Sequence, residues 1–243
     1  MRKILLLFCF AVLVIGFVCR PVFSLPRGVV FAIDKDFPPF TYLENGNPAG
    51  FDVDIVKAIF EKTEIMLTIK LMTWEQALSD LTIRKVHLVS GVDKSREREK
   101  LFIFCKSPLI YDRGVIISKG NINSPADLKC KRVATLKCSI YVSYIDKIKG
   151  IKLDLYATEG EALGALVSGR VDAFVGTERT ALYNIKKHGY KGLKMAGKPI
   201  KQSPLYIAVR STDKDLAVLI DKRQSEIVRD GTYKKIYTKW FGK

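Results

Sequence analysis

Apolar and polar positions along this chain follow two alternating periods, one typical of strands and one typical of helices. The clearest helical stretch follows Gly50, where Phe51, Ile55 and Ile59 recur at helical spacing and share one face. Short apolar runs, each the length of a strand, lie before and after this stretch. Strands that alternate with helices favour parallel βαβ units, so we predict an α/β fold.

The pattern predicts two sets of such units. In the first set, strands are expected at 29–33, 65–71 and 86–92, and helices at 51–64 and 73–85. In the second set, strands are expected at 131–136, 151–157, 171–176 and 191–197, and helices at 139–149, 158–170 and 179–190. Extended segments that cross between the sets are expected at 102–118 and 205–211, and two closing helices at 215–242, broken at Asp230 and Gly231.

Two sets of units joined by two extended crossings describe two lobes with a double-strand hinge. The hinge is expected near 109–114 and 202–208. The first lobe is predicted to comprise 25–111 and the return segment 204–243, and the second lobe 112–203.

The first residues have the features of a secretory signal. Met1, Arg2 and Lys3 precede an apolar run at 4–18, and Ser24 follows as a small residue suited to cleavage. The run is shorter than a bilayer core requires, although an uncleaved anchor is the alternative, and Cys19 leaves lipid attachment open. We therefore predict a cleaved signal peptide at 1–24 and a periplasmic protein.

Charge and cysteine content narrow the possible partners and cofactors. The net charge of +16 loses three basic residues and no acidic one with the signal, which leaves +13, but the basic residues are interspersed with acids and form no aromatic-interleaved block. We expect no nucleic-acid partner. Cys105, Cys130 and Cys138 remain, so at least one thiol is unpaired in a monomer. No Cys/His spacing suggests a metal, and we expect neither metal nor cofactor.

Candidate ligand contacts follow the first predicted strand. Asp34 and Phe37 come at its carboxyl end, where open α/β sheets usually bind small molecules. Pro38 and Pro39 stiffen this exit because their φ angles are fixed.

Seven short motifs occur in order over about two hundred residues, and each is weak alone. They are Phe37-Pro38-Pro39-Phe40, Gly50-Phe51-Asp52-Val53-Asp54, Trp74 opening a helix, Ser95-Arg96-Glu97-Arg98, Ser124-Pro125-Ala126-Asp127-Leu128, Gly169-Arg170-Val171-Asp172-Ala173, and Asp230-Gly231-Thr232-Tyr233 with Trp240-Phe241. The series resembles the periplasmic solute-binding proteins of family 3, the amino-acid receptors of ABC importers. The resemblance implies a two-lobed type II periplasmic-binding-protein fold, the Venus flytrap, with the ligand between the lobes.

The resemblance also implies residues that hold the ligand's carboxylate. Arg98 stands at the family's carboxylate-binding position, and its planar guanidinium suits a carboxylate. Ser139 stands at the hydroxyl position that precedes a helix in the second lobe, although Cys138 replaces the Gly expected before it. Phe37 and Trp74 match aromatic walls of the pocket, with plain core packing as the alternative. Three residues are expected to contact the ligand through their backbone: Ser90, Gly91 and Val92.

The chain departs from the family at Thr177. Amino-acid receptors of the family usually have an Asp there, which pairs with the ligand's ammonium group, and Thr177 carries no charge. We expect Asp34 and Asp93 to supply the acid instead, although Asp93 could simply pair with Lys94. Glu178 is adjacent to Thr177, but neighbouring side chains in a strand point to opposite faces.

These features predict an extracytoplasmic receptor that binds a small carboxylate-bearing solute, an amino acid or a relative of one. It would act as a monomer and deliver its ligand to an ABC transporter permease. One alternative is a cleft enzyme of the cyclohexadienyl or arogenate dehydratase type, with Asp34, Asp93 or Glu178 as the acid. Another is a sensor module that reports to a separate membrane partner.

Overall fold

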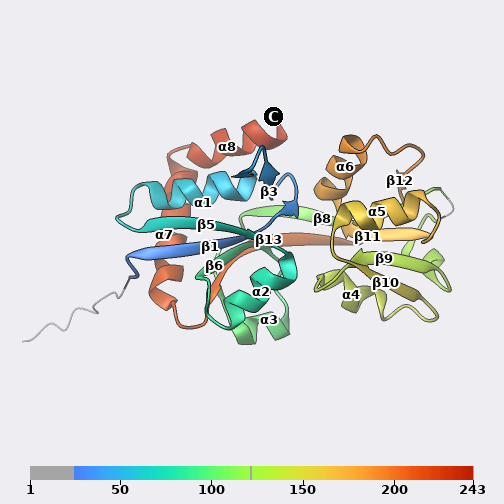
Figure 1. Cartoon of the computed structure of the whole chain (residues 1–243), viewed down its shortest axis with the longest axis horizontal. Helices are drawn as coiled ribbons and strands as arrows, with labels where there is room; N and C mark the ends of the chain where they lie inside the picture. Colours follow the sequence, from blue (N-terminus) through green and yellow to red (C-terminus); the bar gives the residue numbers. More distant parts are fainter. Residues whose placement is uncertain (1–24, 121, 243) are drawn as a thin grey trace, which may run out of the picture.

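The computed structural model describes residues 25–120 and 122–242, so the predicted signal peptide lies outside the described residues. Strands and helices alternate in two lobes (Figure 1), which confirms the predicted two-lobed α/β fold. No helix among the described residues is long and apolar enough to cross a membrane. The lobe boundaries predicted from the sequence stay a prediction.

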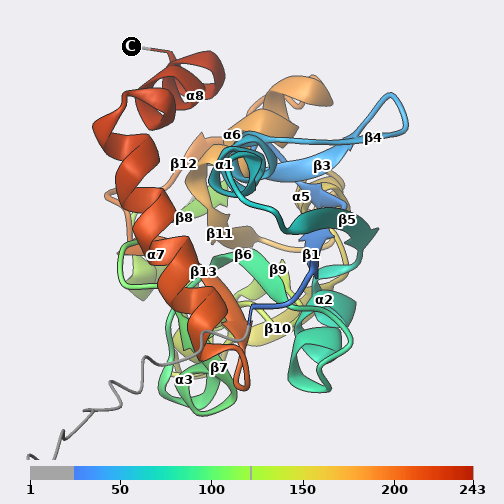
Figure 2. The same cartoon turned by 90° about the vertical axis from the view of Figure 1, so that its left-hand side faces the viewer.

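The first lobe, lobe 1, contains both ends of the described chain. Its strands are β1 (Gly28–Asp34), β2 (Asp36–Phe37), β3 (Thr41–Glu44), β4 (Asn47–Ala49), β5 (Met66–Met72), β6 (Leu88–Val92) and β7 (Phe102–Phe104). Its helices are α1 (Phe51–Glu61), α2 (Trp74–Thr82), α3 (Arg96–Leu101), α7 (Lys214–Arg229) and α8 (Thr232–Phe241). Figures 1 and 2 show α1 and α8 on one face of the sheet and α2 and α3 on the other.

The second lobe, lobe 2, follows the same plan with fewer elements. Its strands are β9 (Arg132–Leu136), β10 (Lys152–Tyr156), β11 (Ala173–Thr177) and β12 (Lys194–Met195). Its helices are the 3-10 helix η1 (Pro125–Leu128) and the α-helices α4 (Ile140–Ile145), α5 (Glu159–Val167) and α6 (Glu178–Lys187).

Two long strands, β8 (Ile110–Ser118) and β13 (Lys201–Arg210), join the lobes into one sheet. The strand order is β10-β9-β11-β8-β13-β6-β1-β5. β8 and β13 are antiparallel and pair from Gly114 with Lys201 to Ile110 with Leu205. This pair is the double strand that the sequence predicts between the lobes.

Each lobe has its own core. The apolar face of α1 is fully buried at Phe51, Ile55 and Ile59, as the helical spacing predicts. The start of this helix requires glycine, because Gly50 has φ +130° and a Cβ there would lie 2.0 Å from the Phe40 carbonyl oxygen. This close approach fixes the start of α1 against the turn that contains Pro38 and Pro39, at the end of β1.

The structure differs from the sequence prediction at two strands. The segment 102–118 is two strands, because Cys105 and Leu109 keep their backbone bonds to β13 while the chain between them turns outward. The predicted strand 191–197 is reduced to Lys194–Met195. The three cysteines of the described residues are free thiols: Cys105 is buried, and Cys130 and Cys138 are exposed.

Helix α6 of lobe 2 contacts lobe 1 beside the hinge. Arg179 donates to the Tyr111 carbonyl oxygen at 2.9 Å and to Asp112 Oδ1 at 3.0 Å, both on β8. Its guanidinium carbon also lies 4.9 Å from the ring centre of Phe241, the last residue of α8. This contact ties the C-terminal helix to lobe 2.

Candidate functional site

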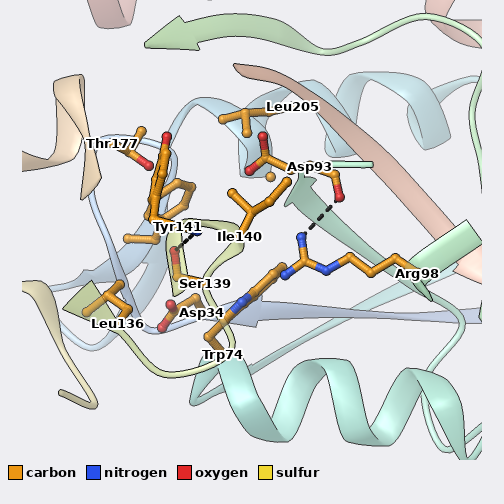
Figure 3. Close-up of a pocket in the computed structure, with 12 residues that line it drawn as sticks. Asp34, Trp74, Asp93, Arg98, Leu136, Ser139, Ile140, Tyr141, Thr177 and Leu205 are labelled. Atoms are coloured by element: carbon orange, nitrogen blue, oxygen red, sulfur yellow. Dashed lines mark hydrogen bonds between the residues drawn. The ribbon is translucent and has the colours of Figure 1, made fainter. Parts of the chain in front are cut away.

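A pocket lies between the lobes. Six of its lining residues come from lobe 1: Asp34, Phe37, Trp74, Gly91, Asp93 and Arg98. Five come from lobe 2: Leu136, Ser139, Ile140, Tyr141 and Thr177. The last, Leu205, lies on β13. Figure 3 shows side chains from both lobes pointing into the same space. The pocket thus includes eight of the ten residues predicted from the sequence.

The topology of the sheet explains why these residues meet. β1 and β6 end at Asp34 and Val92 in lobe 1, and β9 and β11 end at Leu136 and Thr177 in lobe 2. Parallel strands end at the same edge, and ligands bind beyond that edge in open α/β sheets. The double strand turns the two edges toward each other.

Arg98 is held in the pocket by backbone groups of both lobes. Its Nη1 donates to the Asp93 carbonyl oxygen at 3.0 Å, and its Nη2 donates to the Cys138 carbonyl oxygen at 2.8 Å (Figure 3 shows the first bond). The guanidinium carbon lies 5.9 Å from the Trp74 ring centre. A guanidinium has five N–H donors, so three remain for a ligand.

The lobe 2 wall beside Arg98 begins at α4. Ser139 is the N-cap of this helix, and its Oγ accepts from the Tyr141 backbone N–H at 3.2 Å. Cys138, at the position where the family has Gly, adopts φ 57° and still presents its carbonyl oxygen to Arg98. The positive φ therefore occurs here without a glycine.

Asp34 places a carboxyl group in the pocket (Figure 3). Its Oδ1 accepts from the Asp36 backbone N–H at 3.0 Å. Burial outweighs this bond and raises the pKa of Asp34 to about 7. A ligand cation beside Asp34 would favour the ionised carboxylate.

Asp93 occupies the end of the pocket that faces the hinge. Its Oδ1 lies 3.7 Å from Lys201 Nζ, and burial raises its pKa despite that lysine. The alternative expectation of a pair with Lys94 is not what the structure shows, because Lys94 Nζ lies over the Tyr206 ring, 4.1 Å from its centre. The Asp93 carboxyl group can therefore contact a ligand in the pocket, and its ion-pair partner, Lys201, is exposed.

Glu178 does not line the pocket, but strand alternation is not the reason, because Glu178 is the first residue of α6. Its carboxylate accepts two hydrogen bonds from Arg113, one from Nε and one from Nη2, the latter at 2.6 Å. Thr177 faces the pocket without a charge.

Two predicted residues do not line the pocket. The side chains of Ser90 and Val92 are buried in lobe 1, and Ser90 lies beside the buried Asp52. Any ligand contact from them would have to come from their backbone, which stays a prediction. Gly91, between them, does line the pocket, and a Cβ there would lie 3.1 Å from the Phe37 ring.

Sequence reasoning missed the apolar and aromatic part of the lobe 2 wall, which consists of Leu136, Ile140 and Tyr141. The Tyr141 hydroxyl lies 3.3 Å from Ser203 Oγ on β13, and its ring would contact any Cβ at Gly114. The position of Leu136 at a strand end could have indicated a pocket residue. Nothing in the sequence shows that Tyr141 reaches the hinge.

The fold and this pocket define a two-lobed ligand-binding protein whose site combines one fixed guanidinium with carboxyl groups. The model of the bacterial extracellular solute-binding proteins, family 3, matches residues 29–243. The chain belongs to this family.

Individual relatives agree with this membership. The probable amino-acid-binding protein YxeM of Bacillus subtilis (strain 168) is 32% identical over 211 residues, which cover 84% of this chain and 80% of that protein. A solved structure of an ancestral arginine-binding protein bound to glutamine has a TM-score of 0.84 at 33% identity, covering 90% of this chain and 100% of its own. A histidine kinase sensor domain with similarity to periplasmic binding proteins has a TM-score of 0.83 at 25% identity, covering 89% and 96%.

Proposed function

We propose that this protein is a receptor for an amino acid, and that Arg98 binds the carboxylate of this ligand. The observation that carries this proposal is the fixation of the Arg98 guanidinium in the pocket by two backbone carbonyls, one from each lobe. A guanidinium that is already positioned loses little freedom when a carboxylate binds, and charge-assisted bonds of this kind are strong.

We further propose that the side chain of the ligand carries a cation. Asp34 contributes an acid to the same pocket as Arg98, and Phe37 and Trp74 provide aromatic surfaces against which a cationic side chain can pack. A solved structure of the ancestral arginine-binding protein with arginine bound supports this choice, although the same protein has also been solved with glutamine. An amino acid with a guanidinium or ammonium tip offers a carboxylate to Arg98 and a cation to Asp34.

The remaining parts of the proposal come from the family. We infer that the receptor acts outside the cytoplasmic membrane, in the periplasm, as a monomer that delivers its ligand to an ABC transporter permease. The family and the relatives are binding proteins, and we propose no enzymatic activity. The likeness to a histidine kinase sensor domain makes signalling to a separate membrane protein the second candidate.

Three ligands that differ by one group each test the proposal. Arginine carries both the carboxylate and the side-chain cation. Agmatine lacks the carboxylate, and citrulline lacks the side-chain cation. In calorimetry with the protein lacking residues 1–24, we expect arginine to bind at least about tenfold more tightly than either analogue, because each loses a charge-assisted contact. Equal binding of arginine and agmatine would refute the role of the carboxylate, and no binding of any amino acid would refute the receptor function.

A further inference from the structure

We propose that Glu159 is a second acidic contact for the cation of the ligand, so that this cation is held between Asp34 of lobe 1 and Glu159 of lobe 2. The inference rests on the proposed function as a receptor for a cationic amino acid. It assigns to α5 the negative charge that lobe 2 lacks at Thr177.

The position of Glu159 follows from the lobe 2 sheet. Glu159 is the first residue of α5, three residues after the end of β10. β10 runs parallel to β9 with Tyr156 opposite Leu136, and Leu136 lines the pocket. The start of α5 therefore lies at the edge of the sheet that faces the ligand, and Figure 1 shows one end of α5 facing lobe 1.

The Glu159 side chain is buried, and one of its two carboxyl oxygens has no hydrogen-bond partner in the described part of the chain. It is 1% exposed, and its Oε1 has no hydrogen-bond partner among the described residues. The next acid of the same helix has a structural role instead: Glu161 Oε2 accepts from the Thr158 backbone N–H, and the Thr158 hydroxyl accepts from the Glu161 N–H, both at 3.2 Å. Helix capping thus accounts for Glu161 and leaves Glu159 unexplained.

The charged groups that act on Glu159 are all negative. They are Asp34 and Asp36 from lobe 1 and Asp112 from β8, and together with burial they hold the pKa of Glu159 well above its usual range. The second oxygen of Asp112, Oδ2, is also buried without a partner among the described residues. Basic groups act on the nearby acids, Lys35 on Asp34 and both Lys187 and His188 on Asp36, but Glu159 itself forms no ion pair among the described residues.

The two arginines beside this cluster bind other acids. Arg179 binds Asp112 Oδ1, and Arg113 binds Glu178. Among the described residues, no three acids, histidines or cysteines are grouped closely enough to hold a metal ion. An organic cation with several N–H donors, a guanidinium or an ammonium on a flexible chain, is the ligand that could reach both Asp34 and Glu159.

A buried carboxyl without a partner destabilises the folded protein. Glu159 does not line the pocket in this form of the protein, and such a cost near a binding site is typical of a group that is used when the ligand is present. The isosteric substitution Glu159→Gln should therefore have two opposite effects. It should raise the melting temperature of the ligand-free protein and weaken the binding of a cationic ligand.

The test compares Glu159→Gln with Glu161→Gln in calorimetry with arginine and citrulline at one pH. Glu161→Gln is the matched control, because it removes a charge from the same helix turn and glutamine still forms the capping box. We expect Glu159→Gln to weaken arginine binding by about tenfold or more and to change citrulline binding by less than about threefold. Glu161→Gln should leave both affinities within about threefold of the wild type. If Glu159→Gln fails to fold, Glu159→Asp, which keeps the charge on a shorter side chain, should weaken arginine binding selectively.

Three results would overturn the proposal. Arginine binding that is unchanged in Glu159→Gln, or equal losses for arginine and citrulline, would show that Glu159 does not contact the cation. A wild-type protein that binds neutral amino acids but neither arginine nor lysine would refute the role of Glu159 while the receptor function stands. A protein that binds no amino acid at all would refute the receptor function itself, and this inference with it.

Discussion

The substitution Arg98→Ala tests the central contact of the proposed site. It removes the guanidinium that donates to the ligand's carboxylate and also the bond between Nη2 and the Cys138 carbonyl oxygen, which joins the two lobes at 2.8 Å. Truncating one partner of a buried, hydrogen-bonded charge pair costs about 2–5 kcal/mol. The lost bond between the lobes adds to the cost of closure, so we expect a total near 4 kcal/mol, or about a thousandfold in Kd.

The variant Arg98→Lys separates charge from geometry. Lysine keeps the positive charge, but a single ammonium cannot reproduce the planar fork that reaches two carbonyls and a carboxylate together. We expect its loss in arginine affinity to be smaller than that of Arg98→Ala and still about tenfold or more.

Calorimetry with arginine and agmatine measures both variants. Agmatine lacks the carboxylate, so Arg98→Ala should affect its binding only through the lost bond between the lobes. Circular dichroism of the ligand-free variants checks that they are folded. A loss of less than about tenfold for arginine in Arg98→Ala, or equal losses for arginine and agmatine, would refute the assignment of Arg98 to the carboxylate.

Two further predictions concern buried carboxyls outside the pocket. Asp52 is buried, and desolvation raises its pKa from 3.8 to about 7, so its ionisation destabilises the folded state increasingly as the pH rises from about 4 to about 7. In chemical denaturation, the free energy of unfolding of Asp52→Asn should rise by up to about 4 kcal/mol relative to the wild type over this pH range. The exposed Asp146→Asn is the control and should follow the wild type. If the pH dependence of Asp52→Asn runs parallel to that of the wild type, the prediction is wrong. Arg179→Ala leaves Asp112 buried without its ion pair, so we expect a loss of about 2–4 kcal/mol in the free energy of unfolding at pH 8, with the exposed Arg229→Ala as control. Because the pKa of Asp112 is already about 6, the loss should be smaller at pH 5, and an equal loss at both pH values would argue against the ion pair.

Much of the fold could be predicted from the sequence because local and global signals agree. The face of α1, the break between α7 and α8, and the two extended crossings all follow from hydrophobic periodicity and turn residues. The split of 102–118 was missed although Lys106, Ser107 and Pro108 form a polar, proline-containing break between the apolar runs that become β7 and β8. Its backbone bonds to β13 decide the outcome, and these depend on a strand about a hundred residues further along the chain.

The site was predictable where a motif gives the position of a residue, as for Arg98 and Ser139, and where a strand ends, as for Asp34. Tyr141 and Glu159 were missed for different reasons. Tyr141 looks like a core aromatic in a short helix, and its contact with Ser203 depends on how the lobes meet. Glu159 resembles an ordinary acidic residue at a helix start, where acids are common, and only its burial with one unpartnered oxygen distinguishes it.

The double strand of β8 and β13 has a mechanical consequence. Five consecutive residue pairs, from Gly114 with Lys201 to Ile110 with Leu205, connect the lobes as a two-stranded ribbon. Two-stranded ribbons tolerate a wide range of twist, so a rotation of one lobe against the other can be spread over many small torsion changes while every pair stays bonded. No single residue of the ribbon then acts as the pivot, and each residue changes its backbone torsions only slightly. Opening and closing would therefore be governed by the groups that meet across the cleft, such as Arg98 and the Cys138 carbonyl, and only weakly by the link itself.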